Sequence, residues 1–78
     1  MPPYTANQGQ YLAFMYAYTK LHGRPPAEAD IQRYFQTRPP TAHQMILTLE
    51  RRGLLSRTQG QARSIHVLLP PENLPGLR

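Results

Sequence analysis

The sequence predicts a mainly α-helical domain that carries one small β-hairpin. Three observations predict this fold class: apolar residues recur at helical spacing through the first two thirds of the chain, proline and glycine divide that part into three segments, and the spacing alternates beyond Gly53. We expect three helices and a two-stranded ribbon in residues 1–69, followed by a proline-containing C-terminal tail, extended or frayed, in residues 70–78. Seventy-eight residues suffice for one such domain with a modest core.

The first helix is predicted to begin at Ala6, with Thr5 as its N-cap. Gln8 stands three residues after Thr5, the spacing of a capping box, in which each side chain bonds the backbone of the other residue. Gly23, followed by the pair Pro25–Pro26, marks the end of this helix.

The second and third helices are predicted to be joined by a tight turn. The second spans about residues 27–36, and Thr37–Pro39 forms the connection. We expect the third helix to begin at Pro40, because the residue before a proline avoids the helical region and Pro39 should therefore be extended. Its end is marked by Gly53, which can adopt the left-handed conformation common there.

The exposed face of the third helix is rich in groups that can form hydrogen bonds. At about 100° per residue, one side collects Ala42, Met45, Ile46, Leu49 and Gly53. The opposite ridge and its edges consist of Pro40, Thr41, His43, Gln44, Leu47, Thr48 and Arg51. Hydroxyl, amide, imidazole and guanidinium groups can bond base edges in the major groove of DNA, although an ordinary solvent-exposed face would also be polar.

A basic β-hairpin is predicted after the third helix. Leu54–Thr58 and Arg63–Leu69 alternate in polarity around the glycine-containing loop Gln59–Ala62. The whole net charge of +5 falls on residues 31–66, where six arginines face one glutamate. Arginine suits phosphate contact, although a general preference for arginine would give the same count. Two helices joined by a tight turn, with a basic hairpin behind them, form a winged helix-turn-helix.

The composition and the absence of certain motifs exclude several other classes of protein. The chain has no cysteine for a disulfide or a Cys-based zinc site, and its three histidines lack metal-ligand spacing. The longest apolar run, Tyr11 to Tyr18, is far shorter than the roughly 20 residues of a membrane span, and no targeting segment opens the chain, so we expect a cytoplasmic protein. No catalytic constellation or phosphate-binding glycine loop is recognisable, so neither an enzyme, a cofactor nor a small-molecule ligand is expected.

The order and spacing of several short motifs resemble the N-terminal winged-helix DNA-binding domain of LexA-type repressors, over about residues 4–69. The residues that carry the resemblance are Thr5-Ala6-Asn7-Gln8, Phe14, Tyr18, Gly23-Arg24-Pro25-Pro26, Asp30-Ile31, Pro39-Pro40-Thr41-Ala42-His43, Leu49-Glu50-Arg51-Arg52-Gly53-Leu54-Leu55, Gly60 and Ala62-Arg63-Ser64-Ile65.

This resemblance implies a transcriptional regulator that binds duplex DNA with its third helix in the major groove. It implies base-reading positions at Arg38, Pro40, Thr41, His43 and Gln44, and wing contacts at Gln61 and Arg63. The helical pattern independently adds Arg51 as a phosphate contact. The family usually acts as two copies on a palindromic operator; whether this chain forms a homodimer, in solution or only on DNA, is left open.

Three departures from the family pattern shape these expectations. The chain carries no peptidase domain with its Ser/Lys pair, so self-cleavage is not expected. The turn Gln36-Thr37-Arg38 is one residue shorter and lacks a glycine, and Ala27 replaces the usual Ser/Thr cap. We therefore expect a different angle between the second and third helices. Two alternatives stay open, a winged-helix module that binds proteins and a nonspecific architectural DNA binder.

Overall fold

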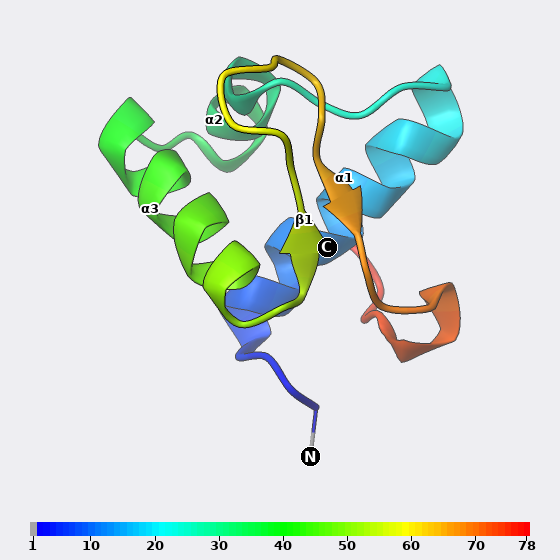
Figure 1. Cartoon of the computed structure of the whole chain (residues 1–78). Coiled ribbons are helices and arrows are strands. Elements are labelled where there is room, and N and C mark those ends of the chain that lie inside the picture. The colour runs from blue at the N-terminus through cyan, green and yellow to red at the C-terminus, as the bar shows by residue number, and fades with distance from the viewer. Residues whose placement is uncertain (1) are drawn as a thin grey trace.

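The computed structural model of the chain describes residues 2–78, and its elements follow the predicted order (Figure 1). The elements are α1 (Ala6–His22), α2 (Glu28–Phe35), α3 (Pro39–Arg51), β1 (Leu55–Ser56), β2 (His66–Val67) and the short 3₁₀ helix η1 (Pro71–Asn73). The two strands pair antiparallel, with Leu55 opposite Val67 and Ser56 opposite His66. The predicted fold class, three helices with a two-stranded wing, is confirmed.

Helix α1 begins and ends as predicted. The Thr5 hydroxyl accepts a hydrogen bond from the Gln8 backbone N–H at 3.1 Å, and the Thr5 N–H donates to Oε1 of Gln8 at 2.9 Å. Gly23 adopts a left-handed conformation with φ of 73°, and its N–H donates to the Thr19 carbonyl. These bonds give partners to backbone N–H and C=O groups that the ends of a helix would otherwise leave without hydrogen bonds.

Helix α2 lacks the residue types that most often cap a helix, a Ser, Thr, Asp or Asn at its N-cap and a glycine after its C-terminus. Ala27 has no side-chain oxygen, and the Asp30 carboxylate instead accepts a hydrogen bond from the Ala27 N–H at 2.8 Å. Gln36 ends the helix in the left-handed region with φ of 53°, a conformation that glycine adopts more readily. The left-handed conformation costs a residue with a Cβ atom roughly 1–2 kcal/mol, so the turn between α2 and α3 is strained.

This strain leads to a testable prediction for Gln36→Gly. Glycine removes the left-handed penalty but is more flexible in the unfolded chain, so we expect a net gain of about 0.5–1 kcal/mol in the free energy of unfolding. Urea denaturation would measure the gain. Gln32→Gly, inside the same helix, should instead lose about 1 kcal/mol. A loss at both positions would contradict the left-handed geometry of Gln36.

Helix α3 begins one residue earlier than predicted. Arg38 is the extended N-cap, with φ of −80° and ψ of 156°, and Pro39 is already helical. The prediction that Pro39 is extended was therefore wrong: the pre-proline restriction acts on Arg38, while two successive prolines fit a first turn whose N–H groups have no helical partner. At the other end Gly53 takes the predicted left-handed conformation, with φ of 75°.

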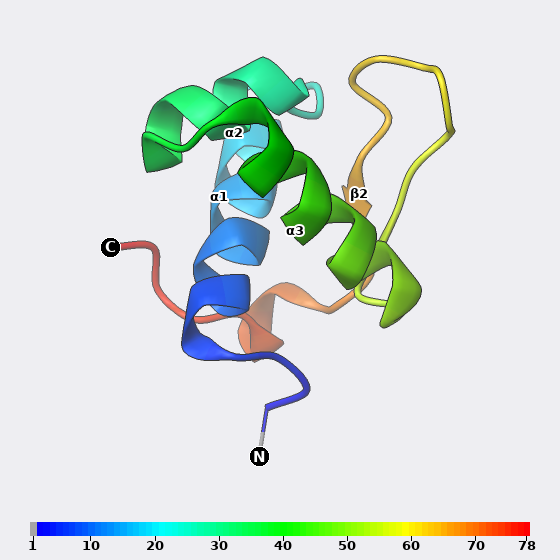
Figure 2. The same ribbon diagram turned by 90° about the vertical axis from the view of Figure 1, so that its left-hand side faces the viewer.

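The hydrophobic core lies between α1, α2, α3 and the base of the wing. Its fully buried side chains include Leu12, Met15, Ile31, Ile46, Leu49 and Leu55. The inner face of α3 contributes Ala42, Ile46 and Leu49 to this core, as predicted, whereas Met45 is only partly buried. Figure 2 shows α3 lying across the front of α1, with the wing loop projecting to one side.

The strands of the wing are shorter than predicted. Each has two residues, and residues 57–65 form the connecting loop. The Ser64 hydroxyl holds this loop together, because it accepts a hydrogen bond from the Thr58 N–H at 2.9 Å and lies 2.9 Å from the Gln61 carbonyl. These side-chain hydrogen bonds take the place of further backbone hydrogen bonds between the two strands.

The C-terminal tail is not frayed, so this part of the prediction was wrong, although Leu74 after η1 is extended, with φ of −96° and ψ of 148°. The Gln10 amide donates to the Gly76 carbonyl at 2.9 Å and accepts from the Arg78 N–H at 2.8 Å, and the Tyr34 hydroxyl donates to the Arg78 carbonyl at 2.7 Å. A Cβ atom added to Gly9 would lie 3.0 Å from the Pro75 ring, so the glycine allows the tail to approach α1 closely. These contacts satisfy polar groups on α1 that would otherwise be buried without partners.

Candidate nucleic-acid interface

The outer face of α3 brings together most of the predicted site residues. Arg38, Pro40, Thr41, Gln44 and Arg51 are exposed, while His43 is half-buried. Thr41, Gln44, Thr48 and Arg51 follow one another at helical spacing and form a single ridge. With a rise of about 1.5 Å per residue, Arg38 and Arg51 stand roughly 20 Å apart along the helix axis. The ridge is therefore uncharged along its middle and positive at both ends.

An open groove of about 510 Å³ runs beside this ridge. It is lined by Gln8, Pro40, Thr41, Gln44, Met45 and Thr48. Gln8 belongs to the first turn of α1 and was not among the predicted site residues, because its capping role accounts for it fully. Only the packing of α1 against α3 brings it to this edge.

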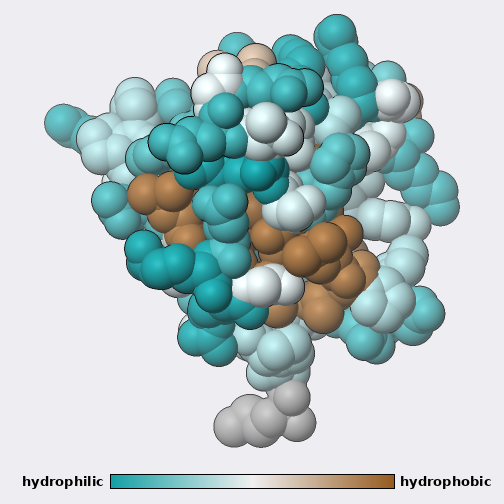
Figure 3. Space-filling view, viewed as in Figure 1, coloured by the Kyte–Doolittle hydropathy of each residue, from teal (hydrophilic) through white to brown (hydrophobic). Residues whose placement is uncertain are grey.

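The tip of the wing is exposed and uncharged. Gln59, Gly60, Gln61 and Ala62 all lie in water, and Gly60 supports the turn with φ of 78°. The predicted contact residue Gln61 is therefore accessible. In Figure 3 hydrophilic residues cover the wing end of the molecule, whereas apolar residues gather near the middle of this view, where β1 lies.

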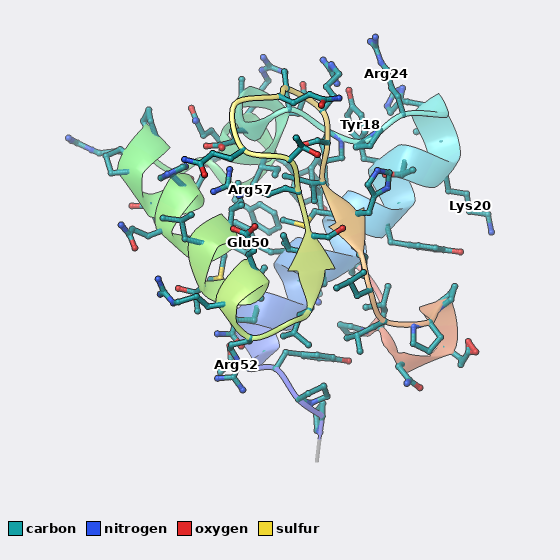
Figure 4. All side chains as sticks on the ribbon, in the orientation of Figure 1. Tyr18, Lys20, Arg24, Glu50, Arg52 and Arg57 are labelled. Atoms are coloured by element: carbon teal, nitrogen blue, oxygen red, sulfur yellow. The ribbon has the colours of Figure 1, made fainter. Side chains whose placement is uncertain are left out.

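The two arginines of the wing are engaged within the protein. The guanidinium of Arg57 donates to the Glu50 carboxylate at 3.0 Å, which ties the wing to α3 (Figure 4). Arg63 donates to the Tyr18 hydroxyl and the Pro25 carbonyl, each at 3.2 Å, and to the Asp30 carboxylate at 3.1 Å.

This geometry gives Arg63 partners within the protein, and its contact with the DNA backbone stays a prediction. Its guanidinium points beneath the wing toward α1 and α2, and Arg63 itself adopts a left-handed backbone conformation with φ of 55°. The carboxylate that holds it is well ionised: the hydrogen bond from the Ala27 backbone, and then the charge of Arg63, lower the pKa of Asp30 against the opposing effect of burial. Arg63 is placed to anchor the wing.

His43 makes a contact that the sequence did not reveal. Its Nδ1 atom lies 3.1 and 3.3 Å from the two carboxylate oxygens of Glu28, in the first turn of α2. The two residues are 15 positions apart, and only the turn between α2 and α3 brings them together.

Neither a membrane-spanning helix nor a metal-binding cluster is found in residues 2–78. In this part of the chain no helix has both the length and the apolar character needed to cross a membrane. The same residues contain no group of three or more His, Asp or Glu side chains suited to hold a metal ion.

Comparison with known proteins connects this geometry to a family. Residues 1–64 match the model of the LexA DNA binding domain. The LexA repressor of Thermosipho africanus (strain TCF52B) is 32% identical over 74 residues, which cover 95% of this chain and 37% of that protein. The LexA repressor of Pseudothermotoga lettingae (strain ATCC BAA-301 / DSM 14385 / NBRC 107922 / TMO) is 41% identical over 64 residues, 82% of this chain and 32% of its own length.

A third relative shows the same pattern of coverage. The LexA repressor of Actinobacillus succinogenes (strain ATCC 55618 / DSM 22257 / CCUG 43843 / 130Z) is 34% identical over 79 aligned positions, covering 94% of this chain and 38% of that protein. The chain thus spans about a third of the length of these relatives. The resemblance found in the sequence is confirmed, and the chain belongs to the LexA DNA-binding domain family.

Proposed function

We propose that this chain binds double-stranded DNA in a sequence-specific manner and acts as a repressor-like transcriptional regulator. The observation that carries the proposal is the outer face of α3, an exposed ridge of hydrogen-bonding side chains with Arg38 and Arg51 at its ends. Membership of the LexA DNA-binding domain family supports it.

In this proposal α3 enters the major groove. Gln44 can form a bidentate contact with adenine, and Thr41 offers a hydroxyl and a methyl group to base edges. Arg38 and Arg51 are separated by more than the roughly 12 Å width of the groove, so they suit the phosphates on its two sides. Pro40 and His43 complete the proposed base-reading set, while Arg38, for which the resemblance implied base reading, is proposed to contact a phosphate.

The wing is proposed to make a second contact with DNA, on the sugar–phosphate backbone. Gln61, at its uncharged tip, can bond the sugar–phosphate backbone through its amide group. Arg63, which the sequence suggested as a second contact, is proposed to hold the wing in position. Binding should then depend on salt mainly through Arg38 and Arg51, at about 0.9 in log K per phosphate neutralised.

Two copies are proposed to act together on a palindromic operator. The LexA-type resemblance motivates this arrangement, and association only on the DNA suffices for it. Selection of bound sequences from a random duplex pool tests it: an inverted repeat with half-site centres about 10–10.5 base pairs apart, or a multiple of this, is expected. Selected sites with a single half-site would contradict it.

The same selection tests base recognition. Gln44→Ala and Thr41→Ala should each relax preference at particular base pairs, at roughly 1–3 kcal/mol. Asn7→Ala removes an exposed amide on a different face, next to Gln10 and Tyr34, and should leave the preference unchanged. Arg51→Ala should weaken binding to all sequences alike and flatten the salt slope by about one.

Other outcomes would favour the alternatives. Equal affinity for every duplex would support a nonspecific architectural DNA binder. Amide signals of α3 that do not move when duplex DNA is titrated at low ionic strength would support a protein-binding winged helix instead.

A further inference from the structure

A carboxylate from α2 holds the imidazole of α3 at the edge of the proposed interface. Nδ1 of His43 lies 3.1 Å from Oε1 and 3.3 Å from Oε2 of Glu28. Both side chains stay partly in water, at 46% and 38% exposure, so the pair sits at the surface and not within the core. Among residues 2–78, no hydrogen bond occupies the Nε2 atom of His43.

This contact determines where the ring carries its proton. An ionised carboxylate only accepts hydrogen bonds, so the Nδ1 atom facing it must be the donor. A neutral imidazole has one N–H group and one acceptor nitrogen. With the proton held on Nδ1, the Nε2 atom of neutral His43 can only accept.

Glu28 lies in the first turn of α2, where its charge suits the helix dipole, but within residues 2–78 its only side-chain hydrogen bonds are those to His43. Asp30, not Glu28, bonds the Ala27 N–H and caps α2. The nearby wing arginines, Arg57 and Arg63, pair with Glu50 and Asp30. A carboxylate beside a DNA-binding helix also repels phosphates, so Glu28 weakens binding unless its contact with His43 compensates.

We propose that Glu28 is a specificity-determining positioning residue, which acts on DNA through His43. This inference rests on the proposed function. Because Nε2 presents a lone pair, it accepts a hydrogen bond from the exocyclic amine of adenine or cytosine, and it is repelled by the major-groove acceptors of guanine and thymine. At the base pair that His43 reads, Glu28 therefore selects a strand bearing an amino group.

The proton position can be measured in the free protein. A long-range ¹H–¹⁵N spectrum of the His43 ring, recorded where the ring is neutral, should show the Nδ1–H tautomer in the wild type. Glu28→Gln should yield a mixture of tautomers, because an amide can either donate or accept. Glu72→Gln, in η1, is the matched control and should leave the ring signals unchanged. An Nε2–H tautomer in the wild type would overturn the proposal.

The consequence for DNA is measured by sequence selection with the same variants. Glu28→Gln should reduce discrimination between amino and non-amino bases at one position by about tenfold, and leave the other positions unchanged. In a His43→Ala background the same substitution should have no effect on preference, because the group that carries the effect is gone. A purely electrostatic role for Glu28 would instead change affinity for all sequences equally, in both backgrounds.

These results separate the two proposals. If the wild type selects a site but Glu28→Gln leaves base preference intact, the inference about Glu28 is wrong and the DNA-binding function stands. If the wild type binds no duplex, both proposals fall together.

Discussion

Replacing Ile46 by alanine should lower the free energy of unfolding by about 2–5 kcal/mol. Ile46 is fully buried on the inner face of α3, within the core cluster that joins α3 to α1 and the wing. The substitution removes three carbon atoms from a site that cannot collapse around them. A small domain has only about 5–15 kcal/mol of stability in total, so this loss is severe. Chemical and thermal denaturation measure it, the midpoint falling by roughly 4–8 °C per kcal/mol.

The neighbouring Leu47 is the matched control. It is an aliphatic side chain of the same size on the same helix, but it faces outward and is only half-buried. Leu47→Ala should cost less than about 1 kcal/mol. Equal losses at the two positions would contradict the orientation of α3, and with it the surface proposed to meet DNA.

The orientation of α3 was predictable because it depends on local periodicity. Ala42, Ile46 and Leu49 recur at helical spacing, so their positions in the sequence are enough to identify the opposite, outward face. The capping box at Thr5 and the left-handed Gly53 were predictable for the same reason. The start of α3 was misplaced by one residue because two prolines in succession satisfy both a turn and a first helical turn.

Features that depend on distant partners could not be predicted. Gln10 pairs with Gly76 and Arg78, nearly at the other end of the chain, and this pairing orders a tail that its prolines alone suggested was loose. The contact between Glu28 and His43 likewise follows from the angle between two helices. Periodicity specifies which side of an element is buried, but not which polar groups meet.

For a related reason, a count of charges could not predict the partners of the wing arginines. Six arginines in residues 31–66 suggested a basic ribbon, but a count along the sequence contains no information about partners. Arg57 pairs with Glu50, seven residues away, and Arg63 pairs with Asp30, 33 residues away. Arg57 and Arg63 thereby tie the wing to α3 and α2, respectively.

The second large effect is expected from Asp30→Asn, which should release the wing. Asp30 makes three contacts: it caps α2 through Ala27, contacts Arg33 of the same helix at 3.3 Å, and pairs with Arg63 under the wing. Asparagine keeps an oxygen for the cap but loses the charge that holds Arg63. After allowance for solvent screening at this partly exposed pair, amide exchange in residues 57–65 should become roughly tenfold faster. Unchanged exchange there would mean that Ser64 alone fixes the loop.

The carboxyl group of Asp30 also makes the free energy of unfolding of the wild type depend on pH. Its pKa is lowered in the folded state, chiefly by the Ala27 hydrogen bond, so the folded protein binds the proton less readily than the unfolded chain. The resulting stabilisation is fully present above the ordinary pKa of an aspartate, about 4, and is lost as the pH falls through the lowered value. Asp30→Asn should therefore lack this part of the acid dependence. The stabilities of the two proteins should approach each other as the pH falls below about 4 and converge below the lowered pKa of Asp30.

Loss of the wing anchor should also have a particular signature on DNA. If Arg63 acts beneath the wing, both Asp30→Asn and Arg63→Ala should weaken binding through the disordered loop, while the salt slope keeps its wild-type value. If Arg63 meets a phosphate instead, Arg63→Ala should flatten the slope by about one and Asp30→Asn, which frees the guanidinium, should not. Salt titrations of the two variants, compared with Arg51→Ala, thus decide whether the wing binds DNA through its charge or through the shape that this charge maintains.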